Sequence, residues 1–222
     1  LLFVAPFVYV VSISLTDPEV YVPFKLYLFP EKLSLDTYRY ILSNSAFVTA
    51  LKNTVFITMA GTVLDLGVTY TFAYVLTKKR MPFHKLFMGM VVFTLMFNAG
   101  IIPNFMMVKS LNLINSRWAL ILPVLTNAWS LIVAKSFIES IPGEIEESAR
   151  IDGCNDIQIF LKMIIPLSKA SIATLTLFFA VSHWNTYFNA LIYLTDSKKR
   201  TLQVYVKSLL IDASTTGVGG HI

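Results

Sequence analysis

The stretch that decides how this chain folds reads Glu144-Ile-Glu-Glu-Ser-Ala-Arg-Ile-Asp-Gly153 and is followed by Met163-Ile-Ile-Pro166. It is a charged, helix-prone insert between two strongly apolar segments. Three glutamates lie near the start of the predicted helix, where negative charge suits the positive end of the helix dipole. Gly153 can adopt the left-handed backbone that ends a helix. A polar hairpin between two apolar segments indicates a surface offered to a soluble partner.

The spacing of side chains predicts that the first part of the insert is an amphipathic helix. Pro142 fits its first turn, where a missing N–H does no harm. Glu146 and Arg150 are four residues apart and can pair along the helix. The same spacing places three apolar residues on one face, namely Ile141, Ile145 and Ala149. We therefore expect a short helix that lies across the surface of the membrane.

A second helix is predicted directly after Gly153. Asn155 and Gln158 have the spacing of a capping pair that opens a helix. Pro166 disfavours helical geometry at Ile165 and marks the entry to the next apolar segment. The second helix would hold the first in place.

The composition of the whole chain predicts an all-α, polytopic membrane protein. Hydrophobic residues make up 55% and charged residues 14% of the 222 residues, and the mean hydropathy is +0.66. Soluble domains carry roughly 25% charged residues. Because one span needs ~20 apolar residues, the chain has room for about five spans.

Five apolar segments alternate with polar ones. They cover residues 1–15, 48–77, 86–108, 119–137 and 170–194. Residues 16–47 are expected to form an extramembrane loop, residues 138–169 the polar insert, and residues 195–222 a polar tail. Both ends look cut, so a complete chain would hold six spans in one membrane domain, of which residues 1–222 are the visible part.

A short basic loop predicts the orientation in the membrane. Lys78, Lys79, Arg80 and Lys85 lie together without an acidic residue. Loops rich in lysine and arginine stay in the cytoplasm. The polar insert is then cytoplasmic as well, and residues 16–47 and 195–222 lie outside. The basic run Lys198-Lys-Arg200 argues against this orientation.

The insert also resembles the EAA loop of ABC importer permeases. That pattern is Glu-Ala-Ala, three residues, Gly, nine residues, Ile, one residue and Leu-Pro, and this chain has Glu147-Ser-Ala149, Gly153, Met163 and Ile165-Pro166. Serine, methionine and isoleucine replace residues of similar size. Further stretches resemble the carbohydrate branch with the maltose-type permeases, in particular its subgroup for complex or oligomeric sugars; they are Asn53-Thr54, Ala73-Tyr-Val-Leu-Thr77, Gly100-Ile-Ile-Pro103, Arg117-Trp-Ala-Leu-Ile-Leu-Pro123, His183-Trp-Asn185 and Phe188-Asn-Ala-Leu191.

The resemblance implies a bundle of membrane helices whose cytoplasmic loop is a coupling helix. In the family this helix inserts into a cleft of an ATP-binding subunit and transmits its closure to the spans. It implies a second, homologous permease, two ATP-binding subunits and an extracellular solute-binding protein in a bacterial inner membrane, with ATP and Mg²⁺ held by the partner. The implied coupling residues are Glu147, Ser148, Ala149, Asp152, Gly153 and Pro166, with Ala149 small for close docking.

Polar and aromatic residues within the apolar segments are candidates for a substrate path. They are Asn98, Trp184, Asn185, Tyr187 and Asn189. Aromatic rings can stack on sugars and amides can bind hydroxyl groups. Asn185 and Asn189 would share a helix face. The same residues could instead pack helices together or anchor them at the membrane interface. The break at Asn98-Ala-Gly100 could line a cavity or be a simple kink.

Asp65 lies deep in the second apolar segment and leaves a rival function open. An intramembrane carboxylate could bind a neighbouring helix or carry protons in a secondary transporter, although the structural role is favoured. Gly61 and Gly67 would let helices approach closely. Other rivals are an ABC importer for another solute and a membrane scaffold. The chain has no P-loop for ATP hydrolysis, no sign of nucleic-acid binding, and only the scattered His84, His183 and His221 as possible metal ligands.

Overall fold

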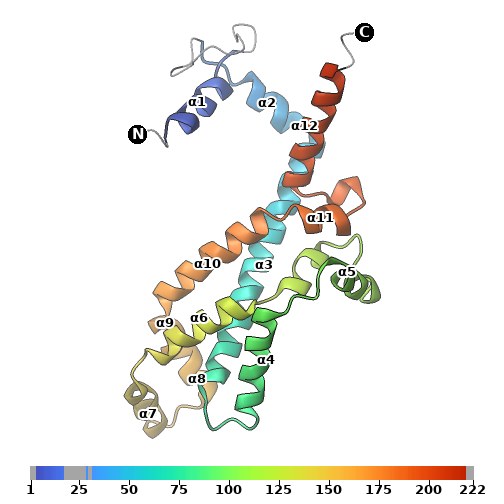
Figure 1. Cartoon of the computed structure of the whole chain (residues 1–222). Coiled ribbons are helices and arrows are strands. Elements are labelled where there is room, and N and C mark those ends of the chain that lie inside the picture. Colours follow the sequence, from blue (N-terminus) through green and yellow to red (C-terminus); the bar gives the residue numbers. More distant parts are fainter. Residues whose placement is uncertain (1–3, 18–28, 30–31, 219–222) are drawn as a thin grey trace. The chain divides into compact units, whose positions relative to one another are not determined.

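The computed structural model describes residues 4–17, 29 and 32–218, with side chains up to residue 211. The elements within these residues are helices, apart from an isolated antiparallel bridge between Thr16 and Leu33. The chain divides into two compact units, Leu1–Leu51 and Lys52–Ile222. Figure 1 shows the order of the helices along the chain.

The first unit contains two short helices, α1 (Ala5–Ser14) and α2 (Asp36–Ser43). The hydroxyl groups of Ser14 and Tyr38 are 2.7 Å apart and join them. The predicted extramembrane loop at 16–47 is therefore partly helical, because Ser34 and Asp36 open a helix there. Residues 18–28 and 30–31 of that loop lie outside the described residues.

Helix α3 (Ser45–Thr77) is 33 residues long and confirms the predicted span at 48–77. It begins where Asn44 Oδ1 accepts a hydrogen bond from the N–H of Ala46 at 2.9 Å. No proline interrupts it, and it ends directly before the basic turn Lys78-Lys-Arg80. It is the one continuous helix among the described residues that is long and apolar enough to cross a membrane.

The third predicted span is broken where the sequence indicated. Helix α4 (His84–Met96) and helix α5 (Ile101–Ser110) are separated by Phe97-Asn-Ala-Gly100. Asn98 Oδ1 accepts a hydrogen bond from the N–H of Gly100, and Gly100 has φ +84°. Gly100 is the N-cap of α5, and its positive φ is a backbone conformation that glycine adopts readily and other residues rarely, so the break follows from local chemistry.

The last two predicted spans are bent or interrupted. Two 3₁₀ turns, Arg117–Leu120 and Leu122–Val124, meet α6 (Ala128–Glu139) at an angle of 54°. Helix α10 (Lys169–Trp184) stops before a three-residue break, and α11 (Phe188–Tyr193) follows. The number of spans by length and composition is one in the described residues, or up to three if each bent pair counts as one. The predicted segments are helical, but most are too short to cross alone.

The predicted polar tail is largely a helix. Helix α12 (Leu202–Val218) follows a 3₁₀ turn at Ser197–Lys199, and residues 219–222 lie outside the described part. Asn53 Nδ2 donates to the carbonyl groups of Lys198 and Arg200 at 2.9 and 3.0 Å. The polar character predicted for the tail does not hold over residues 202–211, which form a short apolar helix.

Two apolar cores hold the second unit together. The first joins α3, α6 and α10 to the polar insert through Tyr70, Ala73, Leu131, Ala134, Ala149, Ile159 and Leu175, all nearly inaccessible. The second joins the other half of α3 to α5, α11 and α12 through Ile57, Val108, Ile121, Ala190, Tyr193 and Val204. The insert is thus packed on the same core as the membrane helices.

Asp65 is buried where α3, α6 and α10 meet. Its Oδ2 is 2.7 Å from Nε2 of His183, and its Oδ1 accepts a hydrogen bond from the N–H of Thr126 at 3.2 Å. Thr126 has φ +54°, and Thr69 donates to its hydroxyl at 2.6 Å. The prediction that Asp65 binds a neighbouring helix is confirmed. We call Asp65, Thr69, Thr126 and His183 the Asp65 cluster.

The expectation of close helix approach holds for one of the two glycines. A Cβ on Gly61 would lie 2.5 Å from Nε2 of His183, so only glycine fits there. A Cβ on Gly67 would meet nothing within 4 Å. Gly61 thus makes the room in which His183 reaches Asp65.

Candidate functional site

Helix α7 (Gly143–Ile151) is the first helix of the polar insert. Pro142 stands at its N-cap, one position before the predicted place, and Glu144 and Glu146 lie in the first turn. Gly153 has φ +83° and its N–H binds the carbonyl of Arg150, while the N–H of Cys154 binds the carbonyl of Ala149 at 2.9 Å. These two bonds form a Schellman motif, which confirms the predicted end of the helix.

Changing Gly153 to alanine is expected to loosen the end of α7 at a cost of about 1 kcal/mol, because a Cβ disfavours the left-handed backbone. Gly143→Ala is a matched control, since neither added Cβ would meet an atom within 4 Å and only Gly153 has a positive φ. Hydrogen exchange of the α7 amides in the purified permease measures the difference. Equal exchange in the two variants would contradict the prediction.

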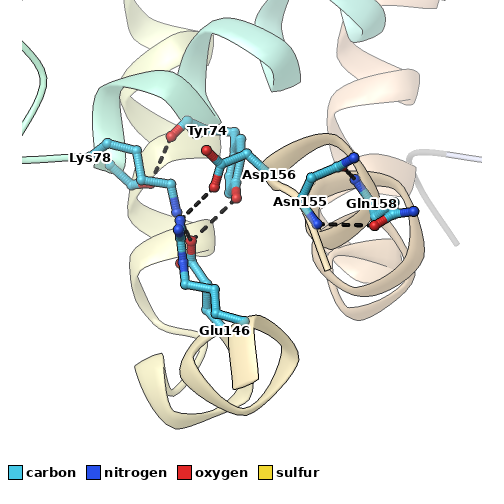
Figure 2. A network of polar contacts seen from close by, with 8 residues as sticks. Tyr74, Lys78, Glu146, Asn155, Asp156 and Gln158 are labelled. Carbon is cyan, nitrogen blue, oxygen red and sulfur yellow. Dashed lines mark hydrogen bonds and ion pairs between the residues drawn. The ribbon is translucent and has the colours of Figure 1, made fainter. Parts of the chain in front are cut away.

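The second helix of the insert begins as predicted, but the expectation that Pro166 disfavours helical geometry at Ile165 was wrong, because Ile165 has φ −60° and ψ −48°. Asn155 Oδ1 accepts a hydrogen bond from the N–H of Gln158 at 2.9 Å, and Gln158 Oε1 accepts one from the N–H of Asn155 at 3.0 Å (Figure 2). This capping box opens α8 (Asp156–Ile159). A π-helical turn at Phe160–Ile164 and helix α9 (Ile165–Leu167), with Pro166 in its first turn, complete the approach to α10. The bend between Asp156–Leu167 and α10 is 80°.

The role expected for Ala149 needs a correction. Its small size was attributed to docking against a partner, but Ala149 is 0% exposed and belongs to the core inside the chain. A larger side chain at this position would have to fit into that core, which also contains Tyr74 and Ile159. Alanine is therefore needed to seat α7 on the membrane helices.

The other implied coupling residues lie on the exposed surface of the insert. These are Glu147, Ser148, Asp152, Gly153 and Pro166. The structure adds two apolar residues that the motif did not single out, Ile151 at 87% and Ile157 at 70% exposure. The sequence signal that could have indicated Ile151 and Ile157 is that each is an isolated isoleucine in a polar loop and does not belong to the apolar face of Ile145 and Ala149. The insert thus presents a mixed acidic and apolar surface.

Glu146 lies on α7, and its side chain reaches the end of α3 (Figure 2). The predicted pairing with Arg150 is confirmed, with Arg150 Nη2 3.3 Å from Glu146 Oε1. The same oxygen forms an ion pair with Lys78 Nζ and accepts a hydrogen bond from the hydroxyl of Tyr74 at 3.3 Å. Arg150 also contacts Asp156 Oδ1 at 2.5 Å. We call Tyr74, Lys78, Glu146, Arg150 and Asp156 the Glu146 network.

The network changes the acidity of Glu146. Burial raises the pKa of this carboxyl, but the hydrogen bond and charge of Lys78, with hydrogen bonds from Arg150 and Tyr74, hold the pKa below its usual value. A lowered pKa in the folded state stabilises the fold above the pKa of the unfolded state. That stabilisation is lost as the pH falls through the lowered pKa.

The melting temperature of the purified permease is therefore expected to exceed that of the Glu146→Gln variant at neutral pH. The difference should be complete above the ordinary glutamate pKa of about 4.3, shrink below that pH, and disappear as the pH falls through the lowered pKa of the folded state. Thermal unfolding of both proteins at a series of pH values measures this. A difference that does not change with pH would show that the charge of Glu146 is not what stabilises the contact.

The candidate path residues lie at or beside two breaks, one between α4 and α5 and one between α10 and α11. Asn98 is exposed in the break between α4 and α5, and Trp184 is 37% exposed at the end of α10. Asn185 caps that end and donates to the carbonyl of Val181 at 2.9 Å, while Asn189 lies on α11. The break between the helices means that Asn185 and Asn189 do not share a helix face as expected. Tyr187, half-buried, packs against the second core.

Known proteins are similar to almost the whole chain. Residues 66–216 match the family described as binding-protein-dependent transport system inner membrane component. The polygalacturonan/rhamnogalacturonan transport system permease protein YtcP of Bacillus subtilis (strain 168) is 44% identical over 96% of this chain and 75% of the relative. Protein LplC of the same organism is 39% identical over 98% of this chain and 74% of the relative.

A solved structure shares the fold. It is a chain of a bacterial ABC transporter involved in the import of the acidic polysaccharide alginate, with TM-score 0.89 and 36% identity over 95% of this chain and 75% of that chain. The helical architecture, the inward-packed polar insert and these matches lead to one conclusion. The chain belongs to the binding-protein-dependent transport system inner membrane components and is a permease of the inner membrane.

Proposed function

We propose that this permease works in an ATP-driven importer and that α7 is the helix that docks on a separate ATP-binding subunit. The observation that supports it most strongly is the two-sided packing of α7. One side, with Ala149, is seated in the chain's own core, and the other presents Glu147, Ser148 and Ile151 to the outside. A short helix seated in this way suits insertion into a groove of a partner.

The complete importer in this proposal contains further subunits. A second, homologous permease completes the path, two ATP-binding subunits hold ATP and Mg²⁺, and an extracellular protein delivers the solute. The chain itself then binds no nucleotide. Closure of the ATP-binding subunits supplies the differential free energy that shifts the permease between inward-facing and outward-facing states.

Cysteine crosslinking in membranes tests the docking. Ile151→Cys and Glu147→Cys, each in a Cys154→Ser background, are expected to crosslink to the ATP-binding subunit in a nucleotide-dependent way. Leu209→Cys on α12, 50% exposed, serves as the control and should not crosslink. Ala149 is unsuitable because it is inaccessible. A folded complex without crosslinks at positions 147 and 151 would remove the proposed docking.

We infer that the solute is an oligosaccharide with acidic groups. The alginate importer is described as carrying an acidic polysaccharide, and the name of YtcP gives polygalacturonan, a polymer of a sugar acid. On the side predicted to face outward, Lys198, Lys199 and Arg200 stand on a turn that Asn53 fixes to α3. Cations near the entry raise the local concentration of anionic solutes.

Stimulation of ATPase activity in the reconstituted complex tests the solute. The binding protein loaded with oligogalacturonide is expected to stimulate ATP hydrolysis strongly. The same protein mixed with the fully methyl-esterified oligosaccharide, which has a similar length and no carboxylates, should stimulate it less. Equal stimulation by both would leave a saccharide importer that does not select for acidic groups. Stimulation by neither would point to another solute.

A further inference from the structure

The Glu146 network joins two helices that are far apart in the sequence. Lys78 directly follows α3 and Tyr74 lies in its last turn, whereas Glu146 lies on α7 (Figure 2). One carboxylate oxygen, Oε1 of Glu146, accepts hydrogen bonds from three donors: Lys78 Nζ, the hydroxyl of Tyr74 and Arg150 Nη2. The end of the long membrane helix therefore meets the proposed docking helix at a single carboxylate.

This contact is more firmly held than a surface ion pair. The side chains of Lys78 and Glu146 are 28% and 25% exposed. Lys78 Nζ lies 4.1 Å from the ring centroid of Tyr74, whose ring is 5.1 Å from that of Phe160. Partial removal from water strengthens the attraction between opposite charges. The two helices are thus fixed to each other at this point.

Two of the connections from α7 to the membrane helices differ in rigidity. Along the chain, α7 reaches α10 through α8, a π-helical turn and an 80° bend. Across the Glu146 network, it reaches α3, which continues without a break to Ser45. Asp65 lies 13 residues from Lys78, or about 20 Å along the helix. A displacement of α7 can reach the Asp65 cluster through one rigid element.

We propose that Lys78 is a positioning residue of the transport cycle, which transmits movement of α7 to α3 through its ion pair with Glu146. The proposal rests on the proposed docking of α7 to an ATP-binding subunit. It goes beyond that docking because Tyr74 belongs to α3 and Lys78 directly follows α3, so neither residue is part of the docking helix α7. Coupling between two sites requires an element that both of them bias, and α3 is that element here.

The complete reconstituted importer tests this role. Lys78→Gln is expected to retain the ATP-binding subunit and its basal ATPase activity, while stimulation by the loaded binding protein falls roughly tenfold, within the usual range of coupling between sites. Lys78→Arg keeps the charge and should retain most of the stimulation. Lys135→Gln is the matched control, since Lys135 Nζ binds Glu139 Oε1 at 2.6 Å and both residues of this ion pair lie on α6.

Charge exchange supplies a second measurement that does not depend on one variant folding well. Lys78→Glu and Glu146→Lys should each reduce stimulation, and the double variant should recover a part of it. Full stimulation in Lys78→Gln, or no recovery in the double variant, would overturn the proposal. Loss of the ATP-binding subunit from Lys78→Gln would also overturn it, because the residue would then shape the docking surface. Failure of the docking itself would show while Lys78 and Glu146 are unchanged, as absent crosslinks in the Glu147→Cys and Ile151→Cys variants.

Discussion

Asp65→Ala is expected to destabilise the folded permease by about 3 kcal/mol, because it leaves the N–H of Thr126 and the imidazole of His183 without their acceptor in a buried place. Asp65 is 3% exposed, so water cannot replace the lost carboxylate. Asp65→Asn has the same shape and can still accept from Thr126, so its loss should be much smaller. Thermal unfolding of the purified complex measures both.

Two glycines of α3 provide a matched pair that tests the same cluster without touching Asp65. Gly61→Ala would place a Cβ 2.5 Å from the ring of His183 and should cost about 1–3 kcal/mol by overpacking. Gly67→Ala meets nothing within 4 Å and should stabilise the helix by about 1 kcal/mol. If Asp65→Ala and Gly61→Ala both melted like the unaltered protein, the cluster would not hold these helices together.

The same variants separate the structural role of Asp65 from the rival role in proton transport. A proton-driven carrier would take up solute without an ATP-binding partner, and Asp65→Asn would fold normally and lose uptake. The structure instead has both carboxylate oxygens in contact with neighbouring groups. We expect Asp65→Asn to retain ATP-dependent uptake in proportion to the amount of folded complex.

Ala149→Leu is expected to prevent assembly with the ATP-binding subunit while the membrane helices stay folded. Ala149 is fully buried, and overpacking costs about 1–3 kcal/mol, which a helix of only nine residues cannot absorb locally. Helix α7 should therefore leave its seat. Co-purification of the ATP-binding subunit with the permease, together with limited proteolysis of the insert, measures the effect.

Ala170→Leu is the control for this prediction, because Ala170 is an exposed alanine at the start of α10. It should assemble as the unaltered chain does. If Ala149→Leu assembled equally well, the packing of α7 on its own chain would not be what positions the docking surface. If both variants failed, the defect would come from the added side chain in general and not from the buried seat.

Local signals in the sequence were enough for several parts of the fold. The uninterrupted apolar run at α3, the capping pair of Asn155 and Gln158, and the left-handed Gly153 each depend on neighbouring residues. The break at Gly100 is of the same kind. Such features depend only on residues within one or two helical turns of each other, so they can be predicted from short stretches of sequence.

The contacts between distant segments could not be predicted. Lys78 and Glu146 are 68 positions apart, and Asp65 and His183 are 118 apart. Each of these residues has an ordinary local explanation, as part of a basic loop, a helix start or an apolar segment. The pairing of Lys78 with Glu146, and of Asp65 with His183, depends on how α3 packs against the insert and α10. The same lack of packing information led to the wrong reason for the size of Ala149.

The left-handed backbone of Thr126 has a consequence for the genetics of this protein. A β-branched residue at φ +54° is strained, and such strain costs of the order of 1–3 kcal/mol when the surroundings enforce it. Here the enforcing groups are Asp65 and Thr69. Thr126→Gly removes the strain and should act as a second-site suppressor of Asp65→Ala. A selection for restored growth on the transported solute, started from that variant, should therefore return glycine at position 126 among its revertants.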